Sequence, residues 1–232
     1  MLRKVLLFSL SVVAFASLNA QNLQLHFDPR RSIYGKDDFQ KNYLTATFEM
    51  FKPDKWGSTF MFVDFDFSSD KGNMGLVYGE IARDFKIDGF ALMPHLEFNG
   101  GLGNGFIIDN AYLVGLSYPF KAGNFFMSTY AAYKLNAFKK NSHDVQWTLT
   151  WTGNFLDNKL TLSGFADIWT QDKRDIQGNS LNDGKKVVFL SEPQIWYNLT
   201  EHFSMGSEIE LSYNFYRDKF YAIPTVAAKW NF

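Results

Sequence analysis

The most constraining feature of this sequence is a succession of segments of about ten residues in which apolar and polar side chains alternate. Side chains of a β-strand point in turn to its two faces, so a period of two predicts strands with one apolar and one polar face. Clusters of Gly, Asn, Asp and Lys separate the segments, as turn residues do, and no helical periodicity is present. The twelve segments are 22–28, 41–52, 58–68, 74–86, 90–99, 106–120, 124–137, 144–155, 159–170, 186–199, 202–216 and 219–232.

The last segment favours a membrane barrel over a soluble β-sandwich. Its apolar side chains alternate up to the C-terminal Phe232, and this pattern resembles the signal that the assembly machinery of bacterial outer-membrane barrels reads. Outward aromatic rings are also typical of such barrels because they settle at the membrane interfaces, whereas a sandwich buries its apolar face against a second sheet. The alternating residues are Phe220, Ala222, Pro224, Val226, Ala228, Trp230 and Phe232.

The connections between segments alternate between longer and shorter ones. The longer set is 29–40, 69–73, 100–105, 138–143 and 171–185, and the shorter set is 53–57, 87–89, 121–123, 156–158 and 200–201; the final connection, 217–218, breaks the pattern by being short. The glycine-rich stretch 100–105 has no helix after it, so we expect an outer turn and not a phosphate-binding loop. We predict an all-β fold, a single twelve-stranded antiparallel transmembrane β-barrel with both termini in the periplasm.

The N-terminus predicts export. Arg3 and Lys4 precede an apolar run, and small residues end at Ala20, which is the layout of a secretory signal peptide over residues 1–20. Cleavage after Ala16 is the alternative, and the expected mature barrel is 21–232. The chain has no Cys, which excludes a lipid anchor through that residue and any disulfide. Its 23 basic and 24 acidic residues give no electrostatic basis for nucleic-acid binding.

If the apolar faces contact lipid, the polar faces line a lumen, because charges are costly in hydrocarbon. Acidic groups predominate there, which favours a hydrated lumen that disfavours anions. The alternative is that these groups form internal pairs that hold a narrow barrel together. The expected inward charges are Glu49, Asp64, Asp66, Glu80, Glu97, Asp167, Glu192, Glu208 and Glu210, with His95, Lys134, Lys186 and Lys229.

Aromatic rings also fall on the inward face. Planar rings can hold a nucleobase by stacking without reading its identity, and nearby carboxylates can accept hydrogen bonds from sugar hydroxyls. The alternative is that the rings only fill space. The inward rings are Tyr43, Phe60, Phe62, Tyr78, Phe165, Trp169, Trp196 and Tyr221.

Three stretches together resemble the nucleoside-specific channel family of the Tsx type and its relatives of unknown function. They are NYLTATFEMFKPDKWGSTFMFVDFD (42–66), YGEIARDFKI (78–87) and SEPQIWYNL (191–199). The matching positions are Glu49, Trp56, Asp64, Glu80 and Glu192 with Pro193, while the loops and the fifth to ninth segments do not match at the residue level. The resemblance implies a monomeric twelve-stranded barrel with a narrow pore that admits nucleosides, in which aromatic residues hold the base and polar residues the ribose.

We therefore expect a passive outer-membrane channel for nucleosides or similar small neutral solutes, without a cofactor or a metal. Its expected partners are outer-membrane lipids, nucleoside-like molecules and, through Phe232, the barrel assembly machinery; no nucleic acid is expected. The predicted lumen-lining set is Glu49, Phe60, Phe62, Asp64, Tyr78, Glu80, His95, Glu97, Asp167, Trp169, Glu192, Trp196, Glu208 and Glu210.

Two other functions remain open. An outer-membrane lipid hydrolase or acyltransferase needs a Ser within reach of an oriented His, and only His95, with Glu97 two residues on, lies in the middle of a segment. A plugged barrel that serves in adhesion or structure would bind through its outer loops and would not conduct.

Overall fold

The computed structural model describes residues 21–137, 142–174 and 180–232. The predicted signal peptide lies outside the described residues. The described chain is nearly all strand, with one short α-helix, α2 (Arg30–Tyr34), and one 3₁₀ turn, Asp70–Gly72. The strands are β1 Gln21–Asp28, β2 Tyr43–Asp54, β3 Gly57–Asp66, β4 Leu76–Phe85, β5 Met93–Gly103, β6 Phe106–Ala122, β7 Phe125–Asn136, β8 Ser142–Phe155, β9 Leu160–Arg174, β10 Ser180–Ser191, β11 Gln194–Asn198, β12 Phe203–Tyr213, β13 Phe220–Pro224 and β14 Val226–Asn231.

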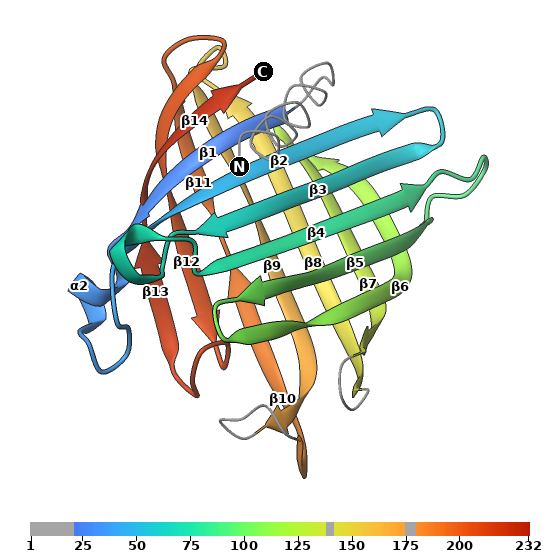
Figure 1. The fold of residues 1–232 in the computed structure, drawn as a ribbon. Helices are drawn as coiled ribbons and strands as arrows, with labels where there is room; N and C mark the ends of the chain where they lie inside the picture. Colours follow the sequence, from blue (N-terminus) through green and yellow to red (C-terminus); the bar gives the residue numbers. More distant parts are fainter. Residues whose placement is uncertain (1–20, 138–141, 175–179) are drawn as a thin grey trace, which may run out of the picture.

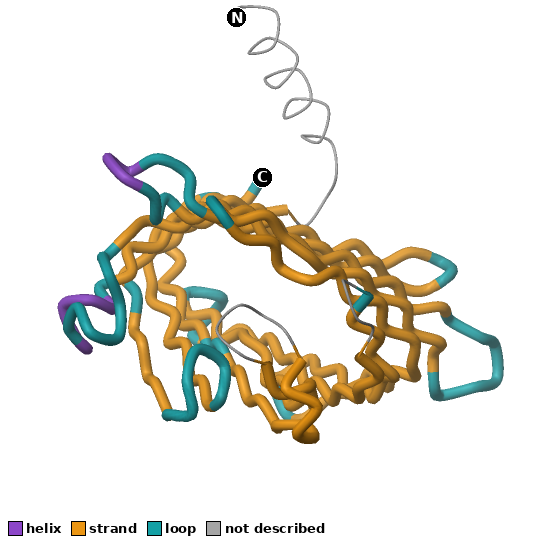
Figure 2. The backbone as a smooth tube through the Cα atoms, turned by 60° about the horizontal axis from the view of Figure 1, so that its bottom comes forward, coloured by secondary structure: helices purple, strands orange, loops and turns teal. Residues whose placement is uncertain are grey.

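The strands form one closed antiparallel barrel. From β1 to β10 each strand pairs with the next in sequence, and β1 closes the ring by also pairing with β14. β10 and β11 both lie between β9 and β12, and β13 and β14 both lie beside β12, so each pair is one broken strand. The fourteen segments therefore make the twelve wall strands that the sequence pattern predicts (Figure 1). Viewed from one end, the ring is flattened (Figure 2).

The outer face of the wall is apolar and exposed. Val145 is 59% exposed, Trp147 41%, Val226 67% and Trp230 46%. Their neighbours along the chain, such as Gln146 and Ala227, are buried on the inner face. This alternation gives the wall a continuous apolar exterior, as in barrels that contact lipid. No helix in the described part of the chain is long and apolar enough to cross a membrane.

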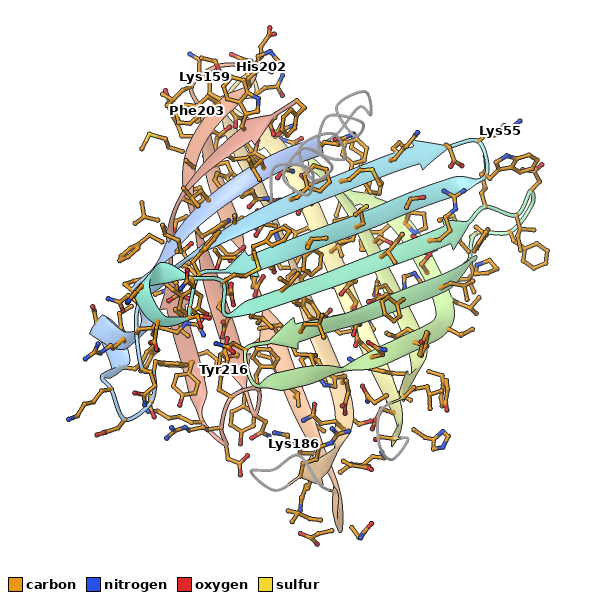
Figure 3. The ribbon with its side chains drawn as sticks, in the orientation of Figure 1. Lys55, Lys159, Lys186, His202, Phe203 and Tyr216 are labelled. Carbon is orange, nitrogen blue, oxygen red and sulfur yellow. The ribbon has the colours of Figure 1, made fainter. Side chains whose placement is uncertain are left out.

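Both described ends of the chain lie at one end of the barrel. The backbone N–H of Phe232 donates to the carbonyl of Gln21 at 3.1 Å. The turns near Lys55, Lys159 and His202 share that end, and the longer connections lie at the other, near Lys186 and Tyr216 (Figure 3). We call these the termini end and the long-loop end. The periplasmic location of the termini stays a prediction.

Three predicted connections are wrong in extent. Gly100 to Gly103 belong to β5, so the turn consists only of residues 104–105. A Cβ on Gly101 would lie 2.6 Å from the Val77 carbonyl oxygen, which explains why a glycine stands in this strand. The predicted loop 171–185 is mostly strand, because β9 reaches Arg174 and β10 begins at Ser180. The final connection spans 214–219 and is not short.

Two breaks in the wall lie side by side. Pro193 separates β10 from β11, and Thr225 separates β13 from β14. Both segments bond to the same stretch of β12: Ile209 N–H donates to the Pro193 carbonyl at 3.0 Å, and Thr225 N–H donates to the Glu208 carbonyl at 2.7 Å. Proline has no N–H to donate to a neighbouring strand. One break falls at Pro193, and the other falls directly after Pro224. Irregularities of this kind re-aim side chains, here around Glu192 and Glu208.

The wall has one edge that no strand covers. In the described structure β13 pairs with β12 alone, because β1 ends at Asp28 and the chain turns into α2 (Figure 1). Tyr34 of α2 takes the place of a strand: its hydroxyl donates to the Ala222 carbonyl at 2.9 Å and accepts from the Ala222 N–H at 2.8 Å. The sequence pattern does not predict α2, whose contacts to β13 close the barrel at the long-loop end.

Candidate functional site in the barrel lumen

The residues predicted to line the lumen all lie on inward positions of the wall. The strand register puts Glu49, Phe62 and Glu80 side by side across three strands. On the facing wall it puts Asp167 beside Thr148 and Glu208 beside Gln194. Their exposure divides them into two groups. The buried group is His95, Glu97, Trp169, Trp196 and Glu210, and the partly accessible group is Glu49, Phe60, Phe62, Asp64, Tyr78, Glu80, Asp167, Glu192 and Glu208.

His95 and Glu97 belong to a buried hydrogen-bonded network. The two ring nitrogens of His95 lie 2.8 Å from Asp84 Oδ1 and 3.3 Å from Glu97 Oε2. Glu97 also accepts hydrogen bonds from Asn99 at 3.0 Å and from the Tyr130 hydroxyl at 2.6 Å. The Tyr130 ring stacks on His95 with centroids 4.0 Å apart. A network with its partners satisfied fixes side chains in place, so these two residues support the wall.

The same network does not form a catalytic triad. The Ser117 hydroxyl donates to Asp84 Oδ1 at 2.7 Å, and both nitrogens of His95 face carboxylates. No serine hydroxyl in the described part of the chain contacts His95. Nucleophilic hydrolysis needs the serine bonded to the imidazole, so this arrangement does not favour it.

Two of the inward rings are covered by lysine side chains. Trp196 is 0% exposed, and the Lys229 ammonium lies 4.2 Å from the centre of its ring. Trp169 is 8% exposed, and the Lys134 ammonium lies 4.7 Å from its ring. A lysine stem and head cover each of these inward tryptophans, which fits the alternative that some inward rings only fill space.

Five carboxylates form a partly accessible set near the wall breaks, which we call the acidic belt: Asp64, Glu80, Asp167, Glu192 and Glu208. Asp64 lies diagonally across from Glu80 of the next strand, and its charge acts on Glu80 and on Glu192 of the facing wall. Asp167 likewise repels both glutamates. The β3–β4 wall and the β9–β12 wall of the flattened barrel therefore bring these carboxylates into one electrostatic group.

Neutral side chains supply most of the hydrogen bonds to the acidic belt, and His26 Nδ1 lies 3.9 Å from Glu208 Oε1. Asp64 accepts from Thr47 and Asp167 from Thr148, both at 2.6 Å, and Glu208 accepts from Gln194 at 2.6 Å. Among the described residues, no side chain donates a hydrogen bond to the carboxylates of Glu80 and Glu192, and no lysine or arginine forms an ion pair with any of the five.

The lysines of the interior donate hydrogen bonds to groups outside the acidic belt, and the Lys134 charge also attracts Glu80 and Asp167. Lys134 donates to Gln146 at 2.8 Å, and Lys185 donates to Asp144 at 2.7 Å and to Asp172 at 2.8 Å. Acidic side chains therefore predominate in the accessible part of the lumen.

Three rings stand beside the acidic belt, and we call Phe60, Phe62 and Tyr78 the ring ladder. The centroids of Phe60 and Phe62 are 6.0 Å apart, and those of Phe62 and Tyr78 are 5.8 Å apart. The register places Phe62 beside Glu80 and Tyr78 beside Asp64. Apolar faces and carboxylates thus alternate along this side of the lumen.

Several inward charges were missing from the predicted set. Asp84 follows Glu80 by four residues on the same face of β4 and was recoverable from that periodicity. Asp144 has four donors: Ser142, Asn136, Thr170 and Lys185. It lies near the start of β8, where the predicted segment began. Among the described residues, no group of three or more His, Asp or Glu side chains is arranged to hold a metal ion.

Comparisons with known proteins identify a family and a fold. A family model described as a domain of unknown function (DUF5020) matches residues 20–232. No curated protein matches the chain. The structure of the NanC porin is similar, with a TM-score of 0.59 and 10% identity over 92% of this chain and 100% of that chain. The structure of the KdgM porin in complex with disordered oligogalacturonate has a TM-score of 0.50 and 8% identity, covering 92% of this chain and 99% of that one.

Proposed function

Because the chain belongs to this family of unknown function, we propose its function from the barrel itself: passive, selective diffusion of small neutral solutes, nucleosides among them, across a bacterial outer membrane. The apolar exterior supports a location in lipid, and the porin fold of the NanC and KdgM structures supports a channel. With a closed ring of its own, one chain suffices to enclose a path, which supports a monomer. Outer-membrane lipids and, through Phe232, the barrel assembly machinery are its proposed partners.

The observation that carries the proposal is the pairing of the acidic belt with the ring ladder. Glu80 and Glu192 have carboxylate oxygens free to accept hydrogen bonds from a solute, and sugar hydroxyls are donors of the matching kind. Phe60, Phe62 and Tyr78 offer apolar faces on which a planar base can stack. A nucleoside has both parts joined, and it has no charge for the belt to repel.

The acidic belt also argues against an acidic solute. The KdgM structure holds oligogalacturonate, which is a polyanion. A solute of that kind would bring its carboxylates next to Asp64, Glu80 and Glu192, with which no lysine or arginine forms an ion pair in the described structure. Like charges close together in a lumen raise the barrier to entry. The proposed selectivity is therefore for neutral over anionic solutes, and for cations over anions among simple salts.

The test is the ionic current through the purified protein in a planar lipid bilayer. The proposal expects steady conductance in KCl, with a reversal potential in a salt gradient of the sign for cations. Adding uridine or adenosine is expected to reduce the current in a saturable manner. If neither uridine nor adenosine changes the current, nucleosides are not the solutes of this channel. If the protein does not conduct at all, a plugged structural barrel is favoured.

A second measurement tests the enzyme alternative. Phospholipid and lipopolysaccharide incubated with the protein should remain intact. Hydrolysis that disappears in a His95→Ala variant, and persists in a His202→Ala variant at the termini end, would replace the channel by an enzyme. His202 is a suitable control because its ring stacks on the outward Trp230 and is remote from the lumen.

A further inference from the structure

A ring of aromatic and acidic side chains surrounds one guanidinium at the long-loop end. Arg30, the first residue of α2, is 8% exposed. Its Cζ atom lies 5.1 Å from the ring centre of Phe39, 4.9 Å from that of Tyr43 and 5.2 Å from that of Tyr216. A cation within about 6 Å of a ring face is attracted by it. We call the surrounding residues Asp28, Phe39, Tyr43, Glu210 and Tyr216 the cation cage.

Every nitrogen of this guanidinium has an acceptor in the cage. Arg30 Nε donates to Asp28 Oδ2 at 2.7 Å, and Nη2 lies 2.6 Å from the same oxygen and 3.3 Å from Glu210 Oε2. Nη1 donates to the Tyr216 hydroxyl at 2.9 Å. Both carboxylates are buried, at 4% and 7% exposure for Asp28 and Glu210. The cage therefore matches the planar, forked donor pattern of a guanidinium, which a spherical ammonium does not reproduce.

The cage is held in shape by contacts that do not involve the guanidinium. Glu210 accepts from Ser212 and from the Tyr216 hydroxyl, both at 2.8 Å. The rings of Phe39 and Tyr216 pack on Tyr221, at 5.2 and 6.0 Å. Tyr221 is 1% exposed and belongs to the wall.

Asp28 is oriented separately. Its Oδ1 accepts the backbone N–H of residue 30 at 2.8 Å, and any non-proline residue at that position supplies this donor. Removal of the guanidinium would therefore leave an organised site with two buried carboxylates and no cation.

Arg30, the residue that occupies the cation cage, is not part of the barrel wall. Arg30 is on a five-residue helix between Pro29 and Gly35, outside the strand ladder. Tyr34 attaches the helix to β13, and ion pairs from Arg217 and Lys219 to Asp38 attach the rest of this connection. The guanidinium thus enters the cage from a segment that is attached at the mouth of the barrel. It fills the space that a separate guanidinium ligand would fill.

We propose that the cation cage is a binding site for small guanidinium compounds at the long-loop end, and that Arg30 occupies it as a tethered ligand with which such compounds compete. The proposal goes beyond the channel function and does not rest on it, since its test measures binding and not transport. The ligand class is an alkylguanidinium with a side chain no longer than that of arginine.

The first test uses an Arg30→Ala variant refolded in detergent, with the temperature of unfolding (Tm) as the readout. Its Tm should be lower than that of the wild type, because two buried carboxylates lose their cation. Millimolar methylguanidinium chloride should raise this Tm along a saturable curve, as expected for a ligand of the folded state. NaCl at equal ionic strength should not, and tetramethylammonium, which has no N–H donor, should have a smaller effect.

The matched control is an Arg83→Ala variant at the termini end. Arg83 donates to both oxygens of Asp54, at 2.8 and 2.9 Å, and lies 5.5 Å from the ring of Phe85, but this pair joins the ends of β4 and β2 and is more accessible, with side chains 22% and 36% exposed. Its Tm should not respond to methylguanidinium. An equal response of both variants, or no response of Arg30→Ala, would overturn the proposal.

A measurement on the wild type tests the competition even if the variant does not fold. Chymotrypsin cleaves after aromatic residues, and Tyr34 and Phe39 are held by the same connection as Arg30. Methylguanidinium should increase cleavage after Tyr34 relative to NaCl, because displacement of Arg30 loosens α2, whereas Phe39 stays in the occupied cage. Cleavage that is the same in both salts would contradict the competition between solute and Arg30.

Discussion

Replacement of Phe62 by alanine is the sharpest perturbation of the ring ladder. Phe62 is the middle ring, with Phe60 and Tyr78 at centroid distances of 6.0 and 5.8 Å. It is partly accessible and stands beside Glu80 in the strand register. A base held against this side of the lumen loses its central contact in the Phe62→Ala variant, while the carboxylate that accepts from the ribose remains.

The size of the effect follows from stacking energies. An aromatic ring contributes roughly 1 to 3 kcal/mol per stacked base in single-strand binders. Because Phe62 is partly covered by its two neighbouring rings, we expect the lower end of that range, about 1 to 1.5 kcal/mol. Since 1.4 kcal/mol is a factor of ten in an equilibrium constant, the nucleoside concentration for half-maximal reduction of current should rise about five- to twelvefold.

The assay is a titration of single-channel current with uridine and adenosine. Phe62→Tyr, which keeps the ring, should bind like the wild type, and Phe98→Ala, which removes an outward ring, should change nothing. Conductance without nucleoside should be unchanged or slightly higher in Phe62→Ala. An unchanged half-maximal concentration in Phe62→Ala, with the channel still open, would refute the assignment of the ladder to base stacking.

Three further predictions concern the charges and the closure of the barrel. Glu80→Gln should move the reversal potential in a KCl gradient toward zero, because it removes one unpaired carboxylate from the acidic belt. Tyr34→Phe should lower the free energy of unfolding by about 1–3 kcal/mol in urea titrations, because the N–H and carbonyl of Ala222 lose their partner. The Lys219 ammonium donates to Asp38 and holds the pKa of that carboxyl below its usual value of 3.8. This stabilisation is present above pH 3.8 and is lost as the pH falls through the lowered pKa, so pepsin digestion of this connection should rise there. Lys219→Ala should weaken this dependence, and Arg217, the second partner of Asp38, should retain part of it.

The alternating pattern predicted the wall because the face of each strand residue is a local property. A period of two assigns Phe62 and Glu80 inward, and Val145 and Val226 outward, without knowledge of the tertiary structure. The even number of segments then favoured closure.

Accessibility within the lumen was not predictable in the same way. Phe62 and Trp196 both point inward, yet one is open to the lumen and the other is covered by Lys229. That difference depends on contacts between strands far apart in sequence. The broken strands at Pro193 and Thr225 also escaped the pattern, because alternation continues across both breaks.

The cation cage is the extreme case of a feature hidden from the sequence. Arg30 and Glu210 are 180 residues apart, and Arg30 is in a connection without periodicity. Only the closure of β1 on β14 brings them together. A charged residue in a loop reads as solvent-exposed from the sequence, and this one is buried.

The most direct test of the central claim compares the uptake of uridine and of uridine monophosphate into liposomes that contain the protein. The two solutes share the base and the ribose and differ in a charged phosphate, so the comparison isolates the effect of the acidic belt. We predict rapid entry of uridine and exclusion of the monophosphate, with the exclusion relaxed in a Glu80→Gln, Glu192→Gln double variant. Equal entry of both solutes, or entry of the monophosphate alone, would contradict a neutral-solute channel with an acidic lumen.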